Sequence, residues 1–181
     1  LLFAPCREYF AEQEQQREQA KAQRVEIISQ MQQLTELDTS SDEFDWKQFE
    51  SKFNRTAKAW RAAGNVDPKT YRELQAQFKA AQSQVQAQLA AFHKANAEQK
   101  AALVEQATQL SQSDDLAAAC QELKALQQTW QTIGFAGMKA ENTLWQQFRR
   151  VNDDTFAKRS AEFEQQKQVQ QQNDEVAAEQ L

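Results

Sequence analysis

The sequence has few of the residues that interrupt helices and few of those that build catalytic or metal sites. Its 181 residues include three glycines, two prolines, two cysteines and one histidine. Glycine and proline disfavour helix interiors, so their scarcity predicts long helices. A Ser-His-Asp or Cys-His arrangement would have to use His93, and a zinc site would need clustered cysteine and histidine. We therefore predict no catalytic residue, no metal or cofactor site and no enzymatic activity.

Long apolar runs and an excess of positive charge are also missing. No stretch approaches the roughly 18 apolar residues of a membrane-spanning helix, and the first residues lack a signal-peptide pattern. These observations predict a cytoplasmic protein without a membrane partner. The net charge of −5 and the pI near 5.1 oppose a general nucleic-acid-binding surface. Because the chain starts without methionine, we expect it to be part of a longer protein.

What the chain does contain favours helix. Glutamine and alanine account for 32 and 29 residues, and both are good helix formers. Hydrophobic residues make up 40% of the chain, which is enough for a folded core. The composition therefore predicts an all-α protein.

An internal repeat of 70 residues emerges when tryptophan and glycine positions are aligned. Trp60 and Gly64 are matched, 70 positions later, by Trp130 and Gly134. The same offset, without a gap, pairs Lys69 with Lys139, Leu74 with Leu144, Gln77 with Gln147 and Phe78 with Phe148. Similarity at a fixed period indicates a tandem-repeat architecture.

The offset grows to 76 further upstream, where Ile27–Leu34 aligns with Leu103–Leu110. The six extra residues fall in the polar stretch 37–44, where a loop tolerates insertion. We predict the helical tail of a truncated preceding copy at residues 1–23, a first three-helix repeat at 24–95 and a second at 96–165. The glutamine-rich residues 166–181 are expected to fray.

Capping residues indicate where the helices of each repeat begin and end. Asp45 and Ser113 are predicted to cap the second helix of the two repeats, and Gly64 and Gly134 to end it. Asp67-Pro68 has the pattern that opens a third helix, with aspartate as the cap and proline at the first helical position.

The third helix of one repeat is expected to continue into the first helix of the next. No glycine or proline interrupts residues 69–110, so a single helix is predicted from Pro68 to about Leu110. The same continuation is expected for Cys6–Leu37 and from Lys139 onward. The predicted fold is therefore a set of elongated tandem three-helix bundles that share long continuous helices, as in the spectrin architecture.

Two segments of the second repeat resemble a known family. They are Leu123–Gly134, with an L-x6-W-x3-G pattern, and Leu144–Arg149, with an L-W-x2-F-R pattern. These patterns are similar to a bacterial family of domains of unknown function, number 349. The first repeat matches less closely, because Gln75 and Lys79 replace the second tryptophan and the arginine. The resemblance implies tandem copies in a longer bacterial cytoplasmic protein, and it brings no catalytic residues.

A basic face on the second helix of the first repeat is a candidate binding surface. At 100° per residue its four cations fall within about a third of the helix circumference, with Glu50 as the nearby counter-charge. The cations are Lys47, Arg55, Lys58 and Arg61. This face is either solvated surface or a docking site for an acidic partner or RNA. The corresponding helix of the second repeat lacks these cations.

Trp145 and Arg149 are further candidates for contact with a partner. Trp145 lies next to Leu144, on the flank of an apolar stripe. Arg149 belongs to a basic pattern, Arg149-Arg150 and Lys158-Arg159, which a ladder of ion pairs through Asp154 would also explain.

The sequence favours a non-enzymatic scaffold or adaptor that binds protein partners, with self-association as one form of such binding. The alternative is a module that associates with nucleic acid or a ribonucleoprotein through the basic face.

Overall fold

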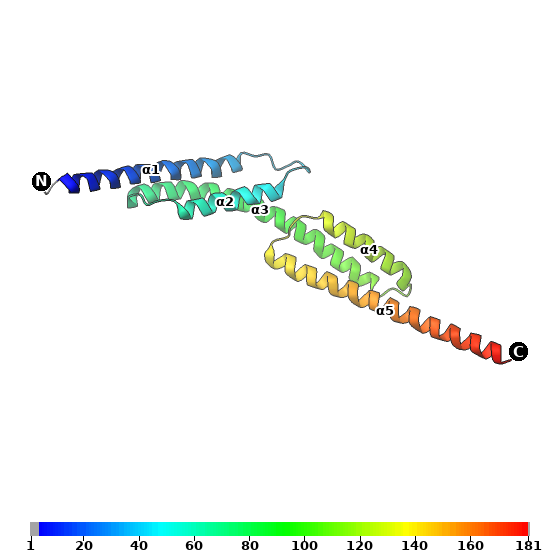
Figure 1. The fold of residues 1–181 in the computed structure, drawn as a ribbon. Coiled ribbons are helices and arrows are strands. Elements are labelled where there is room, and N and C mark those ends of the chain that lie inside the picture. Colours follow the sequence, from blue (N-terminus) through cyan, green and yellow to red (C-terminus); the bar gives the residue numbers. More distant parts are fainter. Residues whose placement is uncertain (1–3, 181) are drawn as a thin grey trace. The chain divides into compact units, whose positions relative to one another are not determined.

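The computed structural model describes residues 4–180, and five helices make up most of that range (Figure 1). They are α1 (Ala4–Thr35), α2 (Trp46–Ala62), α3 (Pro68–Leu110), α4 (Leu116–Thr132) and α5 (Met138–Glu179). Residues 4–180 contain no strand, so the prediction of an all-α protein is confirmed. The chain divides into two compact units, unit 1 (Leu1–Leu89) and unit 2 (Ala90–Leu181).

Unit 1 has one hydrophobic core, to which three helical segments contribute. In Figure 1, α1, α2 and the first half of α3 lie side by side. The core residues recur every three or four positions on each helix, which places them on one face. They include Ile27, Met31 and Leu34 of α1, Phe49, Phe53 and Trp60 of α2, and Leu74, Phe78 and Val85 of α3. Burial of each such side chain contributes about 1.5–3 kcal/mol to folding.

Unit 2 repeats this plan with the second half of α3, α4 and α5. Its core contains Leu103 and Ala107 of α3, Leu123 and Trp130 of α4, and Phe148 of α5. Leu123 and Ala107 have no exposed surface, and Phe148 is 1% exposed.

The long helices are continuous, as predicted. α3 runs for 43 residues from Pro68 to Leu110, through the predicted boundary between the two repeats. α1 covers 32 residues and α5 covers 42. The repeat boundaries themselves, at 23/24, 95/96 and 165/166, fall inside these helices and stay a prediction. α5 is helical through Glu179 with exposed side chains from residue 164 onward, and fraying of this end also stays a prediction. Residues 1–3 and 181 of the predicted ranges lie outside the described part of the chain.

Of the three predicted helix caps, Asp45 and Asp67 are confirmed and Ser113 is wrong. The Asp45 carboxylate accepts a hydrogen bond from the backbone N–H of Gln48 at 2.9 Å. The cap of α4 is Asp115, whose carboxylate accepts from the N–H of Ala118 at 3.1 Å, and not Ser113. Ser113 instead accepts from the N–H of Asp115 at 3.2 Å, because it lies two residues too early to reach the first turn of the helix.

Gly64 and Gly134 lie near helix ends, as predicted, but the predicted reason for glycine at these positions is wrong. The helices end near these residues, but neither glycine has a positive φ; among residues 4–180 only Gly137 does, at 89°. Close packing is the constraint instead. A Cβ at Gly64 would lie 3.0 Å from the Cβ of Ala20, and one at Gly134 would lie 2.7 Å from the ring of Phe92. Both positions therefore hold glycine because a neighbouring long helix approaches closely.

Asp67 gives a testable pH dependence at the start of α3. Its carboxylate accepts hydrogen bonds from the backbone N–H of Thr70 at 3.0 Å and from the Thr70 hydroxyl at 2.7 Å. These bonds, the backbone bond first, hold the pKa of Asp67 below its ordinary value of 3.8. A depressed carboxyl pKa adds stability above the ordinary value, and that stability is lost as the pH falls through the folded-state pKa.

We therefore expect Asp67→Ala to lower the free energy of unfolding at pH 7, and the difference from wild type to shrink at acidic pH. Urea unfolding at pH 7 and at pH 3 measures both effects. Thr70→Val, which removes only the hydroxyl donor, is the control and should raise the Asp67 pKa part of the way in a carboxyl NMR titration. A constant difference between Asp67→Ala and wild type across this pH range would contradict the assignment.

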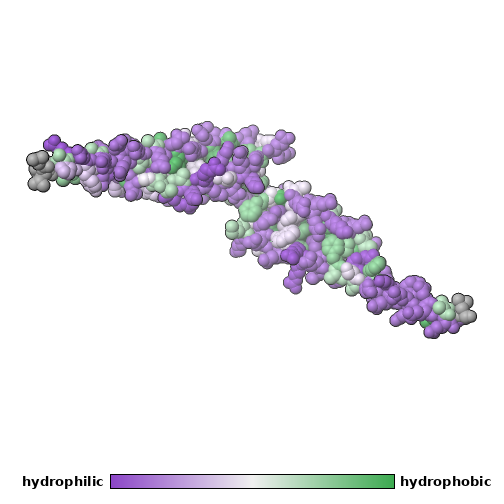
Figure 2. All heavy atoms as spheres, viewed as in Figure 1, coloured by the Kyte–Doolittle hydropathy of each residue, from purple (hydrophilic) through white to green (hydrophobic). Residues whose placement is uncertain are grey.

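On the face shown in Figure 2, the surface of each unit is mainly hydrophilic, with apolar residues in small groups. Large apolar side chains that remain exposed include Trp145 at 46% and Phe163 at 58%. Among the described residues, none of the helices has the length and apolar character to cross a membrane.

Candidate functional site

A stacked tryptophan–phenylalanine pair lies at the same place in both units. In unit 1 the Trp60 ring of α2 stacks on the Phe78 ring of α3, with centroids 4.4 Å apart and planes 4° from parallel. In unit 2 Trp130 of α4 stacks on Phe148 of α5 at 4.6 Å and 11°. All four side chains are buried. The sequence repeat therefore preserves a particular ring geometry as well as a hydrophobic pattern.

A cation from the neighbouring long helix lies over each of these tryptophans. The Arg24 guanidinium of α1 is 4.6 Å from the Trp60 centroid, and the Lys100 ammonium of α3 is 5.0 Å from the Trp130 centroid. Arg24 is 5% exposed and Lys100 is 3% exposed. The two residues are 76 positions apart, which is the offset that relates the first helices of the two repeats. Each unit thus has a cation–Trp–Phe stack, named here by its three members.

The two stacks satisfy their buried cation in different ways. Arg24 donates hydrogen bonds to the backbone carbonyls of Gly64 at 2.9 Å, Ala63 at 2.9 Å and Trp60 at 3.3 Å, at the C-terminal end of α2. A cation is favourable there because the free carbonyls carry partial negative charge. The Tyr71 ring, which stacks beside Trp60 with centroids 6.2 Å apart, also contacts the guanidinium, whose carbon lies 5.2 Å from the Tyr71 centroid.

In unit 2 the position of Tyr71 is occupied by Glu141. The Lys100 ammonium donates to both carboxylate oxygens of Glu141, at 2.7 and 2.8 Å. The backbone N–H of Ala136 donates a further bond to Glu141 Oε2 at 3.0 Å. A neutral aromatic partner for arginine in one unit is thus replaced by a charged partner for lysine in the other.

A groove of about 490 Å³ opens beside the stack of unit 2, between α4 and α5. Its floor is formed by Trp130 and Phe148, and Trp145 forms one side, with its ring centroid 5.7 Å from that of Trp130. Polar groups complete the lining: Gln127, Gln131, Arg149, Asn152 and Asp153. The exposed ring and the polar rim could hold a side chain of a partner by packing and hydrogen bonding.

The polar groups of this groove are held in place by their own contacts. Gln127 donates to the Asn152 side-chain oxygen at 3.0 Å, and Asn152 donates to the Phe148 carbonyl at 2.7 Å. Arg149 and Asp153 form an exposed ion pair at 3.5 Å. Within residues 4–180, Asp154 forms no ion pair with Arg150 or Lys158, so the predicted ladder is wrong in its residues. The i,i+4 pair that forms instead joins Arg149 and Asp153, on the side of α5 that lines the groove.

Unit 1 has a corresponding groove of about 250 Å³ between α2 and α3. Seven lining positions of the two grooves are equivalent at the offset of 70, including both members of the stacked pair. The lining of unit 1 consists of Ala57, Trp60, Arg61, Tyr71, Gln75, Phe78, Lys79 and Gln82. We call the two sites the Trp–Phe grooves. The main differences are Gln75 at the position of Trp145 and a second cation, Arg61, at the position of Gln131.

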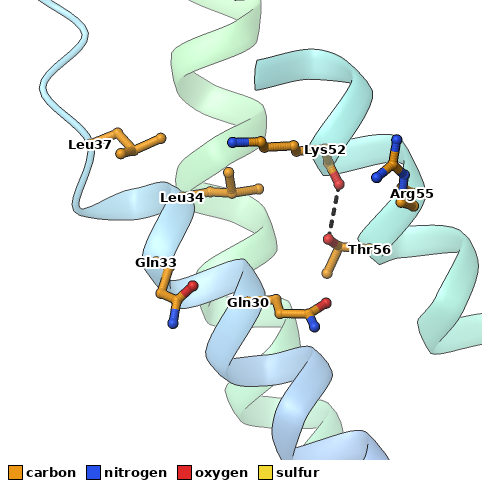
Figure 3. Close-up of a pocket in the computed structure, with 7 residues that line it drawn as sticks. All are labelled: Gln30, Gln33, Leu34, Leu37, Lys52, Arg55 and Thr56. Atoms are coloured by element: carbon orange, nitrogen blue, oxygen red, sulfur yellow. Dashed lines mark hydrogen bonds between the residues drawn. The ribbon is translucent and has the colours of Figure 1, made fainter. Parts of the chain in front are cut away.

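A third hollow of about 410 Å³ lies between α1 and α2 in unit 1 (Figure 3). Gln30, Gln33 and Leu34 line it from α1, and Lys52, Arg55 and Thr56 line it from α2, with Leu37 beyond the end of α1. The Thr56 hydroxyl donates to the Lys52 carbonyl of its own helix at 2.9 Å. The hollow therefore presents two side-chain amides, two cations and two leucines.

Four of the six predicted partner-binding residues line the grooves or the hollow, and the other two lie elsewhere on α2. Arg61 lines the Trp–Phe groove of unit 1, and Trp145 and Arg149 line that of unit 2. Arg55 lines the α1–α2 hollow. Lys47 and Lys58 are exposed on α2, as are the other four residues on their helices. Whether these residues bind a partner stays a prediction.

Sequence reasoning missed Arg24, Lys100 and Glu141. In the sequence they look like ordinary charged residues of a solvated helix face. A signal was nevertheless present, because Arg24 and Lys100 occupy equivalent positions at the offset of 76, where both copies keep a cation.

The model of a family described as Domain of Unknown Function (DUF349) matches residues 1–69 and again residues 68–139. The chain belongs to the DUF349 family. The predicted resemblance, with at least two tandem copies, is thereby confirmed. The comparison with curated proteins and the comparison with solved structures gave no match.

The DUF349 matches show which parts of the chain build a groove. Each match covers a long helix and the short helix after it, α1 with α2 and then α3 with α4. Trp60 belongs to the first DUF349 match, whereas its partner Phe78 belongs to the second. A Trp–Phe groove therefore forms where one DUF349 segment is followed by the next long helix.

Within residues 4–180, no cluster of three or more histidine, cysteine, aspartate or glutamate side chains could hold a metal ion. The features that the two units share are aromatic rings, a buried cation and groove walls that contain side-chain amides.

Proposed function

We propose that this DUF349 chain is a non-enzymatic scaffold that binds protein partners at its Trp–Phe grooves. The observation that carries the proposal is the recurrence of the groove in both units, with seven equivalent lining positions around the same ring stack. Tandem sites at a fixed sequence period are the usual means by which helical-repeat proteins hold a partner at several points.

The composition of the groove supports binding rather than chemistry. Trp145 is 46% exposed although it packs against two buried rings, so it offers apolar surface at little cost in conformational entropy. Arg149 and the two glutamines add hydrogen-bond donors at the rim. Aromatic and arginine side chains of this kind are enriched in the energetically important centre of protein interfaces.

Affinity capture with the immobilised chain, from an extract of the source cells, tests the proposal. We expect wild type to retain a discrete set of proteins, and Trp145→Ala together with Arg149→Ala to lose part of that set. Phe163→Ala is the matched control, because Phe163 is an exposed aromatic residue of α5 that does not line the groove. Identical capture by wild type and the Trp145→Ala/Arg149→Ala variant would contradict a role for the unit 2 groove.

The proposal also includes the finer architecture and the setting that the sequence predicts. We infer an elongated, spectrin-like succession of bundles on shared helices, a cytoplasmic location, and self-association as one form of partner binding. The continuity of α3 through residues of both cores supports the shared-helix part of this inference. Small-angle scattering tests the shape, and a profile typical of a compact sphere would contradict it.

A further inference from the structure

The α2 helix concentrates positive charge on a chain that is otherwise acidic. Its 17 residues include five cations and a single acidic residue, Glu50, whereas the whole chain has a net charge of −5. The cations are Lys47, Lys52, Arg55, Lys58 and Arg61. In α4, the equivalent helix of unit 2, the same five positions hold Ala117, Glu122, Ala125, Gln128 and Gln131. This concentration of charge is therefore specific to unit 1.

These cations extend over the exposed side of α2 from one neighbouring helix to the other. Lys52 and Arg55 line the hollow next to α1, and Arg61 lines the Trp–Phe groove next to α3. Lys47 and Lys58 lie between them in helical position and are exposed. Within residues 4–180, Lys47, Arg55, Lys58 and Arg61 form no ion pair with a carboxylate. We call this surface, together with Lys79 on the groove wall, the α2 basic surface.

The α2 basic surface adjoins apolar side chains at both of its edges: Leu34 and Leu37 in the hollow next to α1, and the aromatic floor of the Trp–Phe groove next to α3. Arg61 and Lys79 line that groove, and its lining contains no carboxylate. A ligand that satisfies both features needs negative charge along its length and one apolar side chain that reaches the Trp60–Phe78 stack. We propose that this surface binds an acidic segment of a partner protein, with its carboxylates on α2 and an apolar residue in the groove. The inference rests on the proposed scaffold function and specifies the chemistry of the partner in unit 1.

The same observations favour a protein segment over a nucleic acid. None of the large apolar side chains exposed within residues 4–180 lies on α2, and the groove rings Trp60 and Phe78 are only 7% and 3% exposed, so neither offers an open face on which a base could stack. A long polyanion would also meet the negative charge of the remaining chain, whereas a short acidic segment confined to α2 would not. The groove, finally, suits a side chain rather than a phosphate, since its floor consists of two aromatic rings.

Selection from a random 16-residue peptide library displayed on phage, with the whole chain as the target, tests the proposal. We expect enriched peptides to be rich in aspartate and glutamate and to contain a leucine or an aromatic residue. The test variant gives α2 the residues of α4, through Lys47→Ala, Arg55→Ala, Lys58→Gln and Arg61→Gln. Alanine and glutamine are good helix formers, so this variant should fold, and circular dichroism verifies that it does. It should bind the enriched peptides at least about tenfold more weakly in fluorescence anisotropy.

A control removes the same amount of charge elsewhere, through Lys139→Gln, Arg150→Gln, Lys158→Gln and Lys167→Gln on α5. These four residues are exposed and lie outside the proposed surface. This control should bind the acidic peptides within about twofold of wild type, because the attraction is local. Equal weakening by the control and the α2 variant would overturn the proposal.

The reciprocal change gives an independent measurement. The reciprocal variant should create binding of acidic peptides in unit 2. It carries Ala117→Lys, Ala125→Arg, Gln128→Lys and Gln131→Arg on α4. In the phage selection, enrichment of neutral or basic peptides, or of no peptide, would overturn the inference. Tighter binding of a 16-nucleotide single-stranded RNA than of the acidic peptides would also overturn it. If apolar peptides that depend on Trp145 are enriched instead, the scaffold function stands and only this inference fails.

Discussion

Replacing Trp130 with alanine is expected to lower the free energy of unfolding of unit 2 by about 3–5 kcal/mol. Trp130 is 7% exposed, stacks on Phe148 at 4.6 Å and lies 5.0 Å from the Lys100 ammonium. The substitution removes the largest ring of the core and leaves a cavity under the groove. It also removes the face on which the buried ammonium rests. Urea unfolding followed by circular dichroism measures the loss.

Trp145→Ala is the matched control for Trp130→Ala. Both tryptophans line the same groove, but Trp145 is 46% exposed and its ring contacts are tilted rather than stacked. We expect its removal to cost about 1 kcal/mol, the value of one peripheral aromatic contact. If the two substitutions lowered stability equally, Trp130 would not be the centre of the unit 2 core. Trp60→Ala should reproduce the effect of Trp130→Ala in unit 1, where Trp60 is also 7% exposed.

Removal of the Lys100 ammonium by Lys100→Met is expected to cost about 3 kcal/mol, because it leaves the partly buried Glu141 carboxylate without its partner. The Lys100 and Glu141 side chains are 4% and 24% exposed, and the ammonium bonds to both carboxylate oxygens. After Lys100→Met, Glu141 keeps the backbone N–H of Ala136 as its remaining donor in the structure. Chemical unfolding at pH 7 measures the loss.

The double substitution Lys100→Met with Glu141→Leu separates the ion pair from simple loss of packing. Because both charges are then absent, we expect it to recover most of the stability that the single change removes. A double variant as unstable as the sum of the two single variants would show that the two charges do not act as a pair. In unit 1 no equivalent rescue is expected, since Arg24 bonds to backbone carbonyls that no substitution removes.

The helices were predictable because their signals are local. Asp67-Pro68 places a cap and a first-turn proline together, and the scarcity of glycine and proline after it predicted that α3 would run to Leu110. Ser113 and Asp115 show the limit of such reasoning. Two good capping residues stand two positions apart, and the pattern alone does not say which one meets the first turn.

The site was predictable only in part, because its parts come from three different helices. Trp145 and Arg149 stood out by their residue type and position, and they line one groove. Arg24 and Lys100 did not stand out, because burial of a charged residue depends on partners about 40 positions away. The reason for glycine at 64 and 134 was hidden in the same way, since it depends on the approach of Ala20 and Phe92.

The continuity of α3 has a consequence for how such chains fold. α3 contributes Leu89 to the core of unit 1 and Leu103 to the core of unit 2, within one helix. When unit 2 is folded, unit 1 can therefore regain its part of α3 by elongating an existing helix. It avoids a new nucleation event, which is unfavourable by about 4 kcal/mol. Each folded unit would thus provide the helix from which its neighbour folds. Folding would then propagate cooperatively from unit to unit along a tandem array, instead of starting independently in each unit.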